Sequence, residues 1–204
     1  MPDLSSRIKK LFASAQQQLR RKNSDKAATL FLEVIGLPGI EQAEPLALES
    51  ARVALAEIYV RSQKIELAEY HINKALAVSP GEPDLHRRLG QLYGYQGDFP
   101  AAAKQFLRAV ELEPHHPEYL HLLGWATFMV GDQKQGRKLM EESYNLDEAN
   151  VPLLSDLALA CSELGDTSAA LKYLDRAIEL DPKNQLWQSQ RERIGAKANR
   201  KKPS

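Results

Sequence analysis

Two adjacent histidines are the first residues in this sequence that suggest metal chemistry. They are His115 and His116, and the nearby carboxylates are those of Glu113 and Glu118. Adjacent histidines in a turn need further ligands to hold a metal ion, and no His or Cys cluster with metal-ligand spacing accompanies them. We therefore expect a solvated turn and no metal site.

The single cysteine, Cys161, is the next candidate for chemistry. It occupies a position that holds tyrosine in other parts of the chain, at Tyr59 and Tyr93, so we expect a buried packing thiol. Acidic pairs such as Glu141-Glu142 are typical of a helix surface, and no glycine-rich phosphate loop is present. We predict that the protein is not an enzyme and uses no cofactor.

Charge and composition argue against several classes of partner. Lys plus Arg and Asp plus Glu both number 27 among 204 residues, so the net charge is zero. A neutral chain has no general attraction to nucleic acid, and no stretch approaches the roughly 20 apolar residues that span a membrane. One cysteine permits no internal disulfide, and the first residues lack a signal-peptide pattern, so we expect a cytoplasmic protein.

The charge is unevenly distributed along the chain. Residues 1–38 carry seven cations and three anions, residues 185–204 carry six and one, and the middle carries 14 and 23, giving +4, +5 and −9. The basic ends could contact phosphates. The N-terminal apolar stripe could likewise lie on a membrane surface, but we favour the first helix of a degenerate repeat for it.

A 34-residue period organises the chain. Leucines 55, 89, 123 and 157 recur at this interval, and five further columns keep the same register. Two of these columns hold small residues: Ala56, Gly90, Gly124 and Ala158 in one, and Ala68, Ala102, Gly136 and Ala170 in the other. Within each period the apolar residues follow helical spacing twice. Small columns allow two antiparallel helices to approach closely, so each period predicts a helical pair that stacks on its neighbours.

Residues typical of helix boundaries support these helical pairs. Gly97-Asp98, Gly131-Asp132 and Gly165-Asp166 each offer a residue free to adopt positive φ and then an N-cap. Pro83 and Pro117 suit the first turn of a helix. Pro45 could begin its helix early and make it about two turns longer than the equivalent helices.

The second full period, LGQLYGYQGDFPAAAKQFLRAVELEP, resembles the tetratricopeptide repeat family, and the resemblance extends over residues 49–184. It implies an all-α fold, a right-handed alpha-alpha solenoid of helix-turn-helix repeats. The expected organisation is a degenerate helical hairpin at 1–38, a linker and early helix start at 39–48, repeats at 49–82, 83–116, 117–150 and 151–184, and a capping helix with a basic tail at 185–204. Leu186 and Trp187 should pack inward from the cap. Gly136 departs from the family's usual Ala and should loosen its helix.

The same resemblance implies where a ligand would bind. In this family the outward face of each repeat's first helix lines a concave groove. Helical spacing places these candidates on that face: Arg87, Arg88, Gln91, Tyr95, His121, Trp125, Phe128, Met129 and Leu159. His121 and Trp125 would hold an apolar group, and Arg87 or Arg88 could pair with a carboxylate of the ligand. Phe128 and Met129 could instead pack against the next repeat.

We therefore expect a scaffold or adaptor that binds a peptide or helix of a partner protein. Two alternatives remain open at this point. Identical chains could self-associate into an oligomeric platform, or the basic ends could serve a regulator at a membrane or nucleic acid.

Overall fold

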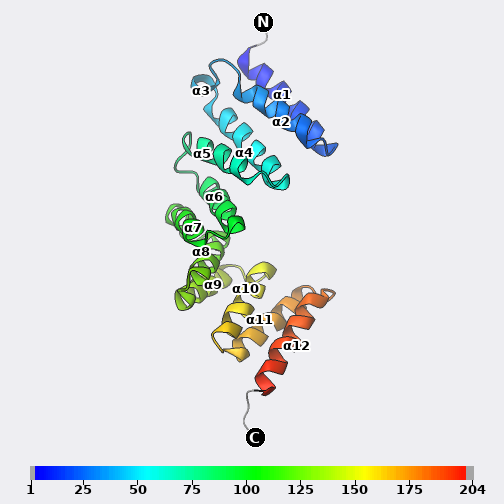
Figure 1. Cartoon of the computed structure of the whole chain (residues 1–204), viewed down its shortest axis with the longest axis vertical. Coiled ribbons are helices and arrows are strands. Elements are labelled where there is room, and N and C mark those ends of the chain that lie inside the picture. Colours follow the sequence, from blue (N-terminus) through cyan, green and yellow to red (C-terminus); the bar gives the residue numbers. More distant parts are fainter. Residues whose placement is uncertain (1–2, 201–204) are drawn as a thin grey trace. The chain divides into compact units, whose positions relative to one another are not determined.

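The structure is a computed structural model that describes residues 3–200, with side chains described as far as residue 196. In this part of the chain every regular element is a helix (Figure 1). The helices are α1 (Leu4–Arg20), α2 (Ser24–Ile35), α3 (Ile40–Ala43), α4 (Pro45–Arg61), α5 (Ile65–Leu76), α6 (Pro83–Gln96), α7 (Phe99–Leu112), α8 (Pro117–Val130), α9 (Gln133–Leu146), α10 (Val151–Glu163), α11 (Thr167–Leu180) and α12 (Gln185–Arg200). The all-α prediction is confirmed. No helix among the described residues is both long and apolar enough to cross a bilayer.

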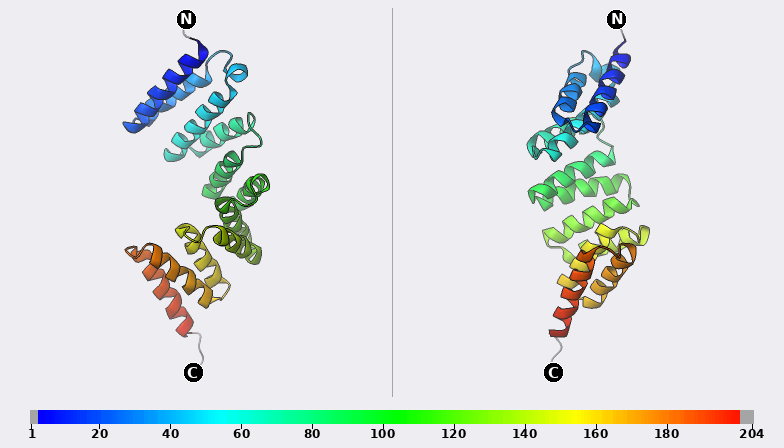
Figure 2. Two further views of the ribbon diagram at one scale, coloured as in Figure 1. Left: turned by 180° about the vertical axis from the view of Figure 1, so that it is seen from behind. Right: turned by 90° about the vertical axis from the view of Figure 1, so that its right-hand side faces the viewer.

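The chain divides into two compact units, residues 1–92 and 93–204, with the boundary inside α6. In the first unit α1 packs on α2 and α4 packs on α5, and both views in Figure 2 show these neighbours side by side. One apolar core, which includes Ala15, Ala27 and Leu55, joins α1, α2 and α4. Ala15 and Ala27 are fully buried in this core.

In the second unit α8 packs on α9, α10 on α11, and α12 covers α11. Ala170 and Leu174 of α11 are fully buried among residues of α10 and α12. Trp187 is buried on the inward side of α12, as predicted. The prediction for Leu186 is wrong, because 54% of that residue remains exposed and only its neighbour reaches the core. Residues 201–204 of the predicted basic tail lie outside the described residues.

The predicted helix starts are confirmed. Gly97, Gly131 and Gly165 have φ of 79°, 114° and 81°. The aspartates that follow them accept hydrogen bonds from the main-chain N–H groups of Ala101, Gln135 and Ala169 at 3.0, 3.2 and 3.1 Å. Such caps satisfy N–H groups that have no partner within their own helix.

The segment at 39–48 differs from its expectation. It contains a separate short helix, α3, and the start of α4 at Pro45. Helix α4 has 17 residues and α6 has 14, so α4 is longer by about one turn and not by two. The extra residues are divided between two elements because Glu44 (φ −142°, ψ 58°) breaks the helical path.

The α8–α9 pair approaches closely through two glycines. A Cβ placed on Gly136 would lie 2.5 Å from the Phe128 nitrogen and 2.6 Å from the Gly124 carbonyl oxygen. Buried Ser143 adds a hydrogen bond of 2.7 Å from its hydroxyl to the Pro117 carbonyl. The sequence suggested that Gly136 loosens this repeat. The structure gives it a packing role instead, since only a residue without Cβ allows this approach.

Candidate functional site

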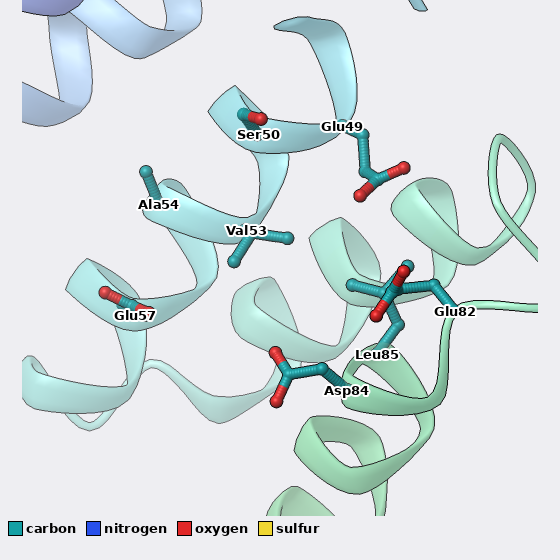
Figure 3. A pocket seen from close by; sticks show the side chains of 8 residues that line it. All are labelled: Glu49, Ser50, Val53, Ala54, Glu57, Glu82, Asp84 and Leu85. Atoms are coloured by element: carbon teal, nitrogen blue, oxygen red, sulfur yellow. The ribbon is translucent and has the colours of Figure 1, made fainter. Parts of the chain in front are cut away.

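A pocket lies between α4 and the start of α6 in the first unit. Figure 3 shows its walls, and its volume is about 290 Å³. The lining residues are Glu49, Ser50, Val53, Ala54 and Glu57 from α4, Glu82 from the segment just before α6, and Asp84 and Leu85 from the first turn of α6. Val53, Ala54 and Leu85 supply apolar surface and four of the other five residues are carboxylates. The pocket therefore has apolar walls beneath an acidic rim.

Two arginines hold one side of this pocket in place. Arg87 donates to Asp84 from Nε at 2.7 Å and from Nη2 at 2.5 Å, and its Nη1 donates to Gln91 at 2.8 Å. Arg88 donates to the other Asp84 oxygen at 2.5 Å and to Glu57 at 2.7 Å. Burial raises the pKa of Asp84, but the hydrogen bonds from Arg88 and Arg87 outweigh it and keep the pKa below its usual value.

This network involves three predicted ligand contacts, Arg87, Arg88 and Gln91, whose binding to a ligand stays a prediction. The sequence suggested that the arginines await a carboxylate from a ligand. The structure shows that carboxylates and an amide of the chain itself already bind them, and Arg87 has only 15% of its side chain exposed. A new partner would have to displace these contacts, which also hold the pocket residues Asp84 and Glu57.

In the second unit, Trp125 and Phe128 belong to one packed cluster. Their rings stack with centroids 6.0 Å apart and planes within 5°, and Phe128 is only 4% exposed. Phe128 packs with Leu153 and Leu157 of α10. Phe128 is therefore a contact between helix pairs and not an open ligand contact, because α10 covers it. Trp125 is half-buried at the edge of the same cluster.

His121 is also occupied within the chain. Its Nε2 lies 2.8 Å from Oδ2 of Asp156 on α10, and only 9% of its side chain is exposed. The His121 ring is buried and its Nε2 is bound within the chain, and contact of His121 with an apolar group of a ligand stays a prediction. His121 links α8 to α10.

Three of the predicted residues in the second unit present apolar surface to solvent. Met129 on α8 is 43% exposed, Leu159 on α10 is 39% exposed and Tyr95 at the end of α6 is 71% exposed. Met129 and Leu159 lie on the outward sides of two helices that contact each other directly. We refer to half-buried Trp125 together with exposed Met129 and Leu159 as the apolar face.

The sequence analysis did not identify this pocket. Glu49, Val53 and Glu57 follow at intervals of four, so they share one side of α4. Asp84 occupies the position of Ser50 one repeat later and lines the same pocket from α6. This spacing was visible in the sequence, and the carboxylates at it were the missed signal.

The residues considered for catalysis or metal binding are Cys161 and His116. Cys161 is fully buried, and burial raises the pKa of its thiol to about 11. His116 stacks on Tyr119 with ring centroids 3.9 Å apart. Within the described part of the chain, no group of three or more His, Cys, Asp or Glu residues is arranged to hold a metal ion.

Residues 83–116 and 151–184 match the family described as "Tetratricopeptide repeat". The chain is also 28% identical over 143 residues to Bacteriophage adsorption protein A of Escherichia coli (strain K12), covering 69% of this chain and 14% of that protein. The chain spans about a fifth or less of the length of the curated relatives it matches.

Solved structures with the same fold are also similar. A tetratricopeptide repeat protein from Parabacteroides merdae superposes with a TM-score of 0.79 at 15% identity, covering 92% of this chain and 72% of that one. YrrB, described as a TPR protein with an unusual peptide-binding site, superposes with a TM-score of 0.69 at 18% identity, covering 89% and 90%. At these identities the likeness concerns the fold alone, and it confirms the alpha-solenoid class expected from the sequence.

Proposed function

Because the chain contains tetratricopeptide repeats, we propose that it is a non-enzymatic scaffold that binds a segment of a partner protein on the outward faces of its first helices. Proteins of this kind generally serve as interaction scaffolds, and the similar YrrB is described as having a peptide-binding site. A cytoplasmic location remains part of the proposal.

The observation that carries the proposal is the apolar face of Trp125, Met129 and Leu159. Helix α8 already buries Leu123 and Ala126 on one side and Phe128 on another. A helix that remains apolar on a further, exposed side is typical of a surface that a partner covers. Trp and Met are also enriched where proteins bind one another.

The exposed residue Met129 offers the sharpest test. Met129→Glu places a charge on the apolar face and should leave the fold intact, because 43% of the residue is already in solvent. Leu107→Glu on α7 is the matched control, since Leu107 is 47% exposed and lies on a second helix. Both variants should melt like the wild type.

Proteins retained from native lysate on each immobilised variant would then be compared. We expect Met129→Glu to lose at least one protein that the wild type and Leu107→Glu both retain. Equal retention by both variants would contradict the proposed surface. Loss with Leu107→Glu alone would place binding on the second helices.

A further inference from the structure

The pocket between α4 and α6 combines two kinds of surface that suit one kind of ligand. Val53 and Ala54 are half-buried and provide apolar walls, and Leu85 closes the inner end with only 2% of its surface exposed. In Figure 3 the carboxylates of the pocket lie on different sides of Val53. Lys and Arg side chains have an apolar stem and a cationic head, so they can place the stem along such walls and the head at such a rim.

The carboxylates of this rim are not equally satisfied. Asp84 and Glu57 are paired with Arg87 and Arg88. Glu49 accepts a hydrogen bond from the Ser79 hydroxyl, and within the described residues neither Glu49 nor Glu82 forms an ion pair. The network thus neutralises Asp84 and Glu57 and leaves Glu49 and Glu82 without a cationic partner among the described residues.

The chain itself carries a segment of opposite charge. Residues 197–202 include four cations, Lys197, Arg200, Lys201 and Lys202, and no carboxylate. The middle of the chain is acidic and the whole has zero net charge. A strong net charge would keep copies apart, whereas a neutral chain with separated charges allows copies to approach with opposite patches facing each other.

We propose that the acidic pocket of one copy binds the basic segment 197–202 of a second copy. The cations meet Glu49 and Glu82, and a lysine or arginine stem lies against Val53 and Leu85. Two different surfaces meet in this contact, so it is heterologous and each added copy leaves one pocket and one segment available. The pocket lies in the first unit and is distinct from the apolar face on α8 and α10.

Complementation between two full-length variants tests the proposal. The first, Glu49→Gln with Glu82→Gln, removes the acidic rim and keeps the basic segment. The second variant removes the cations and keeps the pocket. Its changes are Lys197→Gln, Arg200→Gln, Lys201→Gln and Lys202→Gln. Both sets of changes are confined to exposed or half-buried side chains or to the chain's basic end, and melting curves should confirm that both variants fold.

Sedimentation velocity at low salt would report the assemblies. We expect the wild type to form larger species as its concentration rises, and each variant alone to remain monomeric. The mixture should stop at a 1:1 dimer, because it contains one intact pocket and one intact segment per pair. Raising NaCl from about 0.05 to about 0.5 M should weaken the wild-type association about tenfold or more, since salt screens contacts between exposed charges.

A labelled peptide of residues 193–204 separates the other possible occupants. We expect it to bind the variant with the neutralised segment and to bind about tenfold more weakly once Glu49 and Glu82 are also replaced by Gln. If the wild type stays monomeric while this peptide binds the variant with the neutralised segment, the pocket binds the basic segment of its own chain. That result would overturn the role of a second copy. Failure of the peptide to bind, or binding that ignores the two glutamates, would overturn the site itself. Neither result would bear on the apolar face.

Discussion

The close approach of α8 and α9 at Gly136 predicts that adding one methyl group there weakens the second unit. Gly→Ala inside a helix normally stabilises by up to about 1 kcal/mol, because Ala is the better helix former. At Gly136 the new Cβ would lie 2.5 Å from the Phe128 nitrogen and 2.6 Å from the Gly124 oxygen. Both are main-chain atoms of α8, so relief requires α8 and α9 to move apart.

The size of the effect follows from these two opposing contributions. Overpacking typically costs about 1–3 kcal/mol, and the upper end applies where main chain meets main chain. Subtracting the gain of about 1 kcal/mol in helix propensity leaves a net loss of about 2 kcal/mol for Gly136→Ala. Gly124→Ala should cost less, since its Cβ would meet the Met140 Cγ at 2.8 Å and main-chain atoms only at 2.9 Å.

Gly94→Ala is the matched control, because Gly94 is also helical and a Cβ there meets nothing within 4 Å. Urea unfolding followed by circular dichroism should show Gly136→Ala less stable than wild type and Gly94→Ala equal or slightly more stable. The double change at Gly124 and Gly136 should cost less than the sum of the single changes, since helices already displaced accommodate a second methyl group. A Gly136→Ala protein at least as stable as wild type would refute this account of the α8–α9 pair.

Three further predictions concern single side chains. Burial lowers the pKa of His71 in the folded protein, and the positive charge of Arg52 lowers it further. In the unfolded chain the pKa of histidine is about 6.5, so the unfolded state binds a proton on His71 more tightly than the folded state does. The stabilisation from neutral His71 is therefore complete above about pH 6.5 and lost as the pH falls, and a series of melting curves should show a drop toward pH 5 that is smaller in His71→Gln. Ser143→Ala should lower the free energy of unfolding by about 1 kcal/mol in urea titrations, because it removes the bond to Pro117; an unchanged midpoint would contradict that role. Cys161 should react with a thiol reagent at pH 8 only after denaturation, because burial raises its pKa to about 11, and rapid labelling of the folded protein would show that the thiol is accessible.

Much of the fold could be predicted from spacing alone. The Gly-Asp pairs and prolines act locally, so helix starts such as those near Asp98 and Pro117 followed directly from residue type. The miss at Leu186 has a different origin. Leu186 and Trp187 are adjacent and both apolar, and the orientation of α12 on α11 decides which of them reaches the core.

The candidate site was less predictable because its contacts join different helices. The outward face of α8 followed from helical spacing, and Met129 is exposed there as expected. That His121 meets Asp156, 35 residues later, depends on how α8 and α10 cross. The pairing of Arg88 with Glu57, 31 residues earlier, depends in the same way on α4 and α6. One repeat separates each pair, so polar residues must be compared across neighbouring repeats before they are assigned to a ligand.

Site-specific photocrosslinking tests the central claim most directly. A benzoylphenylalanine would replace Met129 on the apolar face in one protein and Leu107 on α7 in another, two positions of similar exposure in the same unit. After irradiation in native lysate, we predict that position 129 forms a discrete covalent adduct with a partner protein and position 107 does not. Adducts at 107 with none at 129 would contradict a scaffold that binds its partner on the outward faces of the first helices.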